Sequence, residues 1–166
     1  MDPRFPTGKF AFNPNPTTET RRECIASIGS FPAELTAAMS IARFDQPYRE
    51  GGWTGRQVVH HIADSHMNAF VRFRLVLTED QPTIKPYKEA EWAKLADSTT
   101  EDPAVSAQIL DGLHRRWHYM LEAMTGTDFA RAAIHPEHGP VTLDWFLQLY
   151  AWHGRHHIGH LKLTGQ

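Results

Sequence analysis

The stretch TLDWFLQLYAWHGRHHIGHLKL, residues 142–163, predicts the amphipathic helix on which the fold depends. Thr142 is a good N-cap, and from there one stripe of the helix repeats apolar residues at helical spacing before it passes into histidines. This stripe consists of Leu143, Phe146, Tyr150, His153, His157 and Leu161. We expect the stripe to face the interior of a helical bundle, although Gly154 and Gly159 weaken the helix locally.

Three more helices are predicted upstream of this one. The four ranges are about 17 or 18 to 42, 54–78, 102–124 and 142–163. Pro32 should kink or divide the first helix. Thr54 and Gln57 have the spacing of a capping box, and Asp102 followed by Pro103 is a typical helix start. Gly126 is expected to provide a left-handed C-cap after the third helix.

The remaining segments are read as connections. Residues 1–16 contain four prolines and predict an extended arm whose aromatic residues pack on the body. Residues 79–101 form a long connection with one short helix over KEAEWAKLA, residues 88–96. AAIHPEHGP, residues 132–140, predicts a turn-rich loop with two solvent-exposed histidines, His135 and His138.

The fold class follows from these segments. No strand-like alternation persists along the chain, so we expect an all-α four-helix bundle with a long connection between the second and third helices. On the third helix the expected apolar face is Ile109, Leu113, Trp117 and Leu121. The length of 166 residues fits a single domain over residues 1–166.

Composition excludes several classes of function. The formal charge is −2 with acidic and basic residues interspersed, so neither nucleic acid nor an anionic membrane is an expected partner. The chain lacks an apolar run of about 18 residues, the length of a membrane span. The single cysteine, Cys24, excludes an internal disulfide framework and fits a cytoplasmic location.

Histidines carry the functional signal. Seven of the eleven lie in VVHHIADSH, residues 58–66, and WHGRHHIGH, residues 152–160. The second segment holds two i,i+4 pairs, 153/157 and 156/160, and this spacing places both imidazoles of a pair on one helix face. A single buried histidine is more often an ordinary core residue, but this clustering favours a metal site. A third histidine from another helix would leave a coordination position open for catalysis.

Helical periodicity favours one pair over the other. His153 and His157 share the inward stripe, whereas His156 falls on a flanking face and His160 lies nearer the helix end. On the second helix, His61 lies at the edge of the apolar stripe. His60 and His66 remain open as alternatives to His61, because the pattern does not exclude them.

Three segments together resemble the bacterial YfiT proteins of the DinB/YfiT-like superfamily. They are YREGGWTGRQVVHHIADSHMNAFVRFRLVLTED at 48–80, PTIKPYKEAEWAKLADS at 82–98 and LYAWHGRHHIGHL at 149–161. The resemblance covers nearly the whole chain and implies a four-helix bundle with one divalent metal ion, zinc or nickel, on three histidines. One of them follows a tryptophan by eight residues, here His61 after Trp53, and the other two form the HxxxH pair His153 and His157. The resemblance also implies a homodimer.

The implied function is that of a metal-dependent hydrolase acting on a small-molecule substrate. Three imidazoles on one divalent ion, zinc before nickel, leave a position for water. No general base can be assigned from the sequence, because the Glu of HExxH is missing and Gly154 follows His153.

Two alternatives use the same three ligands. One is a metal-dependent thiol S-transferase, in which the ion binds a low-molecular-weight thiol and Arg56, Arg72, Arg74 or Arg155 holds its charged groups. The other is a non-catalytic metal-binding bundle in which His156 or His160 completes the ligand set.

Overall fold

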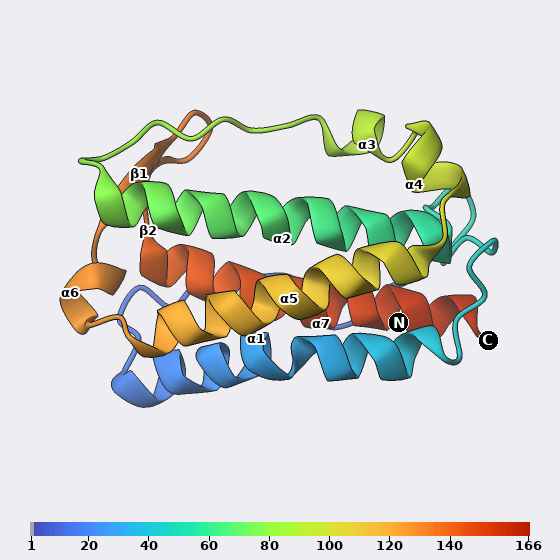
Figure 1. Ribbon diagram of the computed structural model, residues 1–166, viewed down its shortest axis with the longest axis horizontal. Helices are drawn as coiled ribbons and strands as arrows, with labels where there is room; N and C mark the ends of the chain where they lie inside the picture. The colour runs from blue at the N-terminus through green and yellow to red at the C-terminus, as the bar shows by residue number, and fades with distance from the viewer. Residues whose placement is uncertain (1) are drawn as a thin grey trace.

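The computed structural model describes residues 2–166 as a bundle of four long helices with three short helices and a two-stranded hairpin (Figure 1). The helices are α1 (Thr18–Met39), α2 (Gly55–Thr78), α3 (Glu89–Trp92), α4 (Ala96–Thr100), α5 (Pro103–Glu122), α6 (Gly126–Phe129) and α7 (Leu143–Thr164), and the strands are β1 (Ala132–His135) and β2 (Gly139–Thr142). Helices α1 and α2 each pack against both α5 and α7. The prediction of a four-helix bundle is therefore confirmed.

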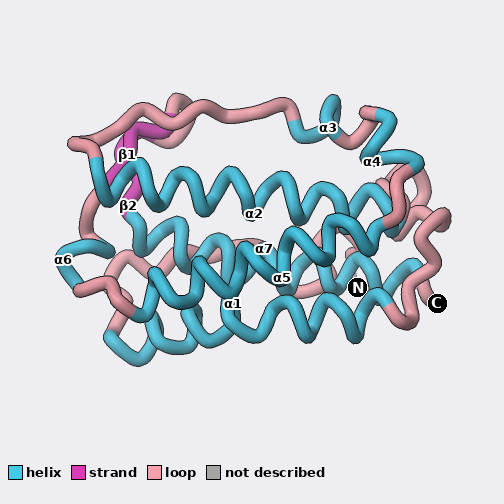
Figure 2. Tube along the Cα trace, viewed as in Figure 1, coloured by secondary structure: helices cyan, strands magenta, loops and turns pink. Residues whose placement is uncertain are grey.

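The long connection runs along the outer side of α2, as Figure 2 shows, and carries α3 and α4. It forms two short helices where the sequence predicted one. Helix α4 packs against α2. In the described residues, 2–166, no helix combines the length and the hydropathy needed to cross a bilayer.

Local capping sets where the long helices begin. The Thr54 side chain accepts a hydrogen bond from the Gln57 backbone, and the Gln57 side chain returns one to the Thr54 backbone. The side chains of Asp102 and Thr142 cap α5 and α7 by accepting from the backbone N–H groups of Ala104 and Trp145, without a reciprocal bond. These caps satisfy backbone N–H groups that have no partner within their helices. The predicted starts of these three helices are therefore confirmed.

Helix α1 continues through Pro32 as one element, so of the two predicted effects, a kink or a division, the division is wrong. The helix also ends at Met39, three residues before the predicted end. Proline has no N–H, so the carbonyl of Ile28, four residues earlier, loses its helical donor. The His114 ring supplies a replacement, with Nδ1 2.7 Å from the Ile28 carbonyl oxygen.

The segment predicted as a loop at 132–140 is an antiparallel hairpin of β1 and β2. Gly139, with φ of +69°, adopts the left-handed conformation at the start of β2. Thr83 of the long connection bridges to Ile134, which ties this connection to the hairpin. Each strand has only four residues, and the bridge to Thr83 joins segments that are distant in sequence, so short local patterns did not reveal these pairings.

Two details of the third long helix were also predicted wrongly. Ile109 is exposed, and the buried face instead passes through Leu110, His114, Trp117 and Leu121. The spacing of four, three and four residues keeps these side chains on one stripe. Gly126 does not cap α5 but begins α6, after Thr125 as N-cap.

The apolar core forms two clusters along the bundle. Phe73, Trp117 and Phe146 belong to the cluster nearer the hairpin, and Leu35 and Ile158 to the other. A bidentate ion pair between Arg21 of α1 and Asp144 of α7, at 2.7 and 2.8 Å, closes the hairpin end of the bundle. Along α7, His153 and His157 lie between Tyr150, which belongs to the cluster nearer the hairpin, and Ile158, which belongs to the other.

Candidate metal centre

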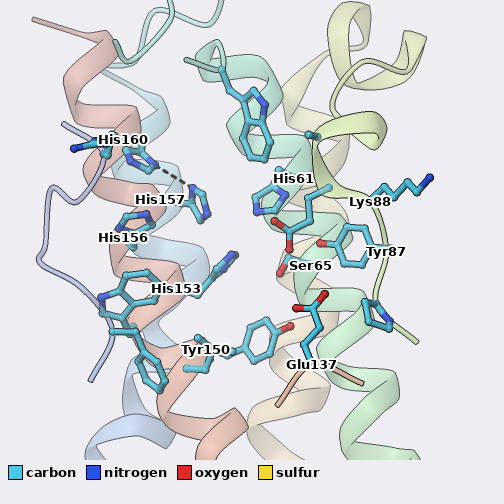
Figure 3. A pocket seen from close by; sticks show the side chains of 18 of the residues that line it. His61, Ser65, Tyr87, Lys88, Glu137, Tyr150, His153, His156, His157 and His160 are labelled. Carbon is cyan, nitrogen blue, oxygen red and sulfur yellow. Dashed lines mark hydrogen bonds between the residues drawn. The ribbon is translucent and has the colours of Figure 1, made fainter. Parts of the chain in front are cut away.

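His61 of α2 and His153 and His157 of α7 converge beside the core (Figure 3). One ring nitrogen from each lies within 4.8 Å of the other two. Their ring centroids are 5.4 Å apart for His61 and His153, 4.8 Å for His61 and His157, and 4.4 Å for His153 and His157. The structure thus brings together the three histidines that the sequence favoured.

Helix packing sets the position of these rings. His153 and His157 are one turn apart on α7 and share a face. Gly154 permits the close approach of α7 to α1, because a Cβ atom there would lie 2.7 Å from the Phe31 ring. On the opposite side, Trp53 packs against His61 with ring centroids 4.7 Å apart.

Burial keeps the three imidazoles neutral. It lowers the pKa of His61 to about 4 and the pKa values of His153 and His157 well below the usual 6.5, and neighbouring histidines lower them further. A neutral imidazole offers a lone pair, which is the form that binds metal. Three such nitrogen donors fit a divalent ion of the zinc class and leave a coordination position for another ligand.

A cavity of about 1160 Å³ adjoins the three histidines. Figure 3 shows the hydroxyl groups of Ser65, Tyr87 and Tyr150 and the carboxylate of Glu137 at this cavity, which all four residues line. Burial raises the pKa of both tyrosines, so their hydroxyls stay protonated as donors. Tyr87 and Glu137 were not predicted as site residues, because they come from the long connection and the hairpin and show no helical periodicity.

Among the other histidines of the second helix, His60 is occupied elsewhere. Its Nδ1 lies 2.8 Å from the Ser106 hydroxyl and its Nε2 lies 3.1 Å from the Glu101 carbonyl oxygen. His66 is fully buried, with Nε2 3.1 Å from His153 Nδ1. Both therefore use their ring nitrogens in hydrogen bonds within the protein.

The other i,i+4 pair of α7, His156 and His160, forms a second histidine group together with His157. Ring nitrogens of His156, His157 and His160 also lie within 4.8 Å of one another. His156 stacks on Trp152 with centroids 4.4 Å apart, on the flanking face that periodicity predicted. His160 Nδ1 lies 3.2 Å from His157 Nδ1, so this ring contacts a candidate ligand directly.

His135, Glu137 and His138 form a third group at the turn of the hairpin. His138 is exposed, as predicted, but His135 is half-buried, so that prediction was right for one of the two. All three residues line the cavity. The hairpin therefore places them at the mouth of the site.

Comparison with known proteins shows the family of this chain. The family model described as DinB superfamily matches residues 33–161. The chain belongs to the DinB superfamily. DinB relatives in Bacillus cereus (strain B4264) and Bacillus mycoides (strain KBAB4) are 47% and 46% identical over 163 residues, covering 96% of this chain and 94% of each relative. Both are named "putative metal-dependent hydrolase".

A solved DinB structure gives the same result for the fold. YfiT from Bacillus subtilis superposes with a TM-score of 0.93 at 42% identity, covering 97% of this chain and 94% of that one. It is described as "a probable metal-dependent hydrolase with an unusual four-helix bundle topology". The resemblance to YfiT found in the sequence is confirmed.

Proposed function

We propose that this protein is a metal-dependent hydrolase in which His61, His153 and His157 hold one divalent ion. The proposal depends on one observation above all: three neutral imidazoles from two helices converge within 4.8 Å at the wall of a large cavity. The names of the Bacillus relatives support the same activity. The expected substrate is a small molecule that enters this cavity.

Zinc is the first candidate for the ion and nickel the second, because both accept neutral imidazole nitrogen readily. When bound, such an ion lowers the pKa of a coordinated water and polarises a carbonyl or phosphoryl group. The protein's part is to hold the three ring nitrogens in place beside a cavity that admits substrate.

The cavity supplies groups that can act on a bound substrate. The Tyr87 and Tyr150 hydroxyls are donors for a substrate oxygen that gains negative charge. Glu89 is the candidate for the general base, because it lines the cavity and burial raises the pKa of its carboxyl group. Glu137, whose carboxylate also enters the cavity, is the second candidate.

Thiol transfer remains the alternative, and one observation favours it. Of the four arginines considered for a charged thiol, Arg72 lines the cavity, and in the described residues it makes no ion pair. Its guanidinium instead contacts the Tyr150 hydroxyl and the Lys85 carbonyl. Arg72 is therefore free to bind a carboxylate of a thiol cofactor. The non-catalytic bundle is the less favoured reading, since a fully ligated storage site needs no adjoining cavity.

Activity assays on metal-stripped protein test the proposal. Chelator-treated protein, with and without added zinc, would be screened on activated carboxylic and phosphate esters, and separately on an electrophile with a low-molecular-weight thiol. We expect zinc-dependent ester hydrolysis that His153→Ala abolishes. Zinc-dependent thiol transfer without hydrolysis would replace the hydrolase with the transferase. No zinc-dependent turnover of either kind would contradict both.

Three further expectations stay predictions: a single domain over residues 1–166, a homodimer and a cytoplasmic location. Exposed apolar side chains on the long connection, Trp92 and Leu95, are candidate dimer contacts. Sedimentation equilibrium of the wild type and of a Leu95→Glu variant tests the dimer. A wild type that stays monomeric would exclude it.

A further inference from the structure

A chain of three hydrogen-bonded histidines leads from helix α1 into the proposed metal centre. His114 Nδ1 lies 2.7 Å from the Ile28 carbonyl oxygen, and His114 Nε2 lies 2.8 Å from His66 Nδ1. His66 Nε2 in turn lies 3.1 Å from His153 Nδ1. The chain therefore uses both ring nitrogens of His114 and His66 and one of His153.

The hydrogen bond from His114 to the Ile28 carbonyl decides which nitrogen donates in each later hydrogen bond of the histidine chain. A carbonyl oxygen can only accept, so His114 Nδ1 must carry the hydrogen. This carbonyl is free to accept a side chain because Pro32, four residues on, has no N–H to offer it. The proline inside α1 thus provides a fixed acceptor at the start of the chain.

A neutral imidazole has one donor nitrogen and one acceptor nitrogen, so the direction passes from ring to ring. With Nδ1 of His114 donating, its Nε2 accepts from Nδ1–H of His66. His66 Nε2 then accepts from Nδ1–H of His153. The one arrangement that satisfies all three hydrogen bonds leaves the lone pair of His153 on Nε2.

The surroundings favour neutral rings held in fixed orientations. His66 and His114 are each 1% exposed. Phe31 packs on both, with ring centroids 5.1 Å from His66 and 4.8 Å from His114, and Trp117 contacts both from α5. Burial lowers the pKa of His114 to about 4 and that of His66 well below its usual value.

We propose that His66 and His114 are positioning residues that fix His153 as the Nδ1–H tautomer and so present its Nε2 lone pair to the metal ion. Metal-bound histidines usually donate their second nitrogen to a carboxylate, a carbonyl or water. Here His153 donates to His66, and His66 donates to His114. The Ile28 carbonyl fixes this order because it can only accept from His114. This inference rests on the metal site proposed above.

Two substitutions of His114 separate the hydrogen bonds from packing. His114→Phe fills the space but removes the acceptor for His66 Nδ1. In His114→Gln, the amide N–H can donate to the Ile28 carbonyl while the amide oxygen accepts from His66, so the direction is kept. Trp117→Phe is the matched control, because Trp117 is buried beside the same rings and its indole N–H has no partner in the described residues.

Zinc affinity, measured by competition with a chromophoric chelator, is the first readout. We expect His114→Phe to weaken zinc binding by about 10- to 100-fold, the usual effect of removing a group that orients a metal ligand. His114→Gln and Trp117→Phe should stay close to the wild type. An equal loss in Trp117→Phe would assign the effect to packing and overturn the proposal.

NMR of nitrogen-labelled histidines in the metal-free protein near neutral pH is the second readout, and in the wild type it needs neither metal nor a variant. We expect hydrogens on Nδ1 of His114, His66 and His153, and a changed tautomer of His153 in His114→Phe. A hydrogen on Nε2 of His153 in the wild type would overturn the proposal. If the tautomers are as expected but the wild type binds no zinc, the metal site itself fails.

Discussion

The ring nitrogens of the buried histidines differ in what remains available to a ligand. Burial lowers the pKa of His61, His66 and His157 alike. The pKa values therefore do not distinguish the proposed metal ligands from the histidines that support them. Hydrogen bonding does, because both nitrogens of His66 are engaged by other rings. At the scale of the residue, the partner of each nitrogen decides whether an imidazole can bind metal.

His160 and His156 provide a test at this scale. His160→Ala removes the ring next to His157 Nδ1 and should weaken zinc binding by up to about 10-fold without abolishing it. His156→Ala is the control and should leave the affinity unchanged, because in the described residues His156 Nδ1 has no hydrogen-bond partner. Competition with a chelator measures both. If both variants lose zinc as fully as His61→Ala does, the ion is bound by the second group instead.

Helical periodicity predicted the pair His153 and His157 on α7, because it places side chains on faces. It left His60, His61 and His66 open on α2, and His61 was implied by the resemblance to YfiT. Periodicity did not predict the contact of His66 with His114. These residues are 48 positions apart on different helices. The carbonyl of Ile28 can accept from His114 because Pro32, in α1, has no N–H to offer it. No pattern within one helix carries that information.

At the scale of the element, the approach of α7 to α1 depends on a missing side chain. Gly154 follows His153 directly, and the Phe31 ring occupies the space that a Cβ atom would take. Phe31 also packs on His66 and His114. Helix packing and the orientation of the histidines therefore depend on the same contact.

Gly154→Ala should lower the free energy of unfolding by about 1–3 kcal/mol, the usual cost of overpacking a core. Gly112→Ala is the matched control, because Gly112 lies in α5 with open space around its Cβ position. That change should raise the free energy by about 0.5–1 kcal/mol through helix propensity. Urea denaturation of the metal-free variants measures both. Equal stabilities of the two variants would show that the contact with Phe31 is relaxed at little cost.

The elements were predictable to different degrees. Thr54, Asp102 and Thr142 marked the helix starts because capping is a local effect that a few residues determine. The hairpin was missed because each strand has four residues, and its pairing with Thr83 depends on a distant segment. Local rules locate the bundle but not the parts that cover its cavity.

At the scale of the whole molecule, the buried histidines make stability depend on pH. In the folded protein the pKa of His114 is about 4, against 6.5 in an unfolded chain. Between these values the unfolded chain binds more protons, so acid favours unfolding. Asp64 acts in the opposite direction, because burial raises its pKa from 3.8 to about 6 and the folded protein then binds the extra proton. The buried histidines with a lowered pKa outnumber Asp64, so their effect on stability is the larger one.

The metal-free protein should therefore lose stability as the pH falls from 6.5 to 4. His114 alone accounts for a loss of about 3 kcal/mol over this range. His114→Gln should flatten the curve and Asp64→Asn should steepen it. Urea denaturation at a series of pH values gives the curve for each variant. A stability that stays constant or rises on acidification would contradict the neutral state of these rings.

The metal content of protein purified without a histidine tag shows whether His61, His153 and His157 hold an ion. Elemental analysis would compare the wild type with His61→Ala, His153→Ala and His157→Ala, and with His135→Ala and His138→Ala as controls from the hairpin. We expect about one zinc or nickel ion per chain in the wild type and the controls, and little in the other three variants. A wild type without stoichiometric metal, even after zinc is added back, would contradict the proposed metal site.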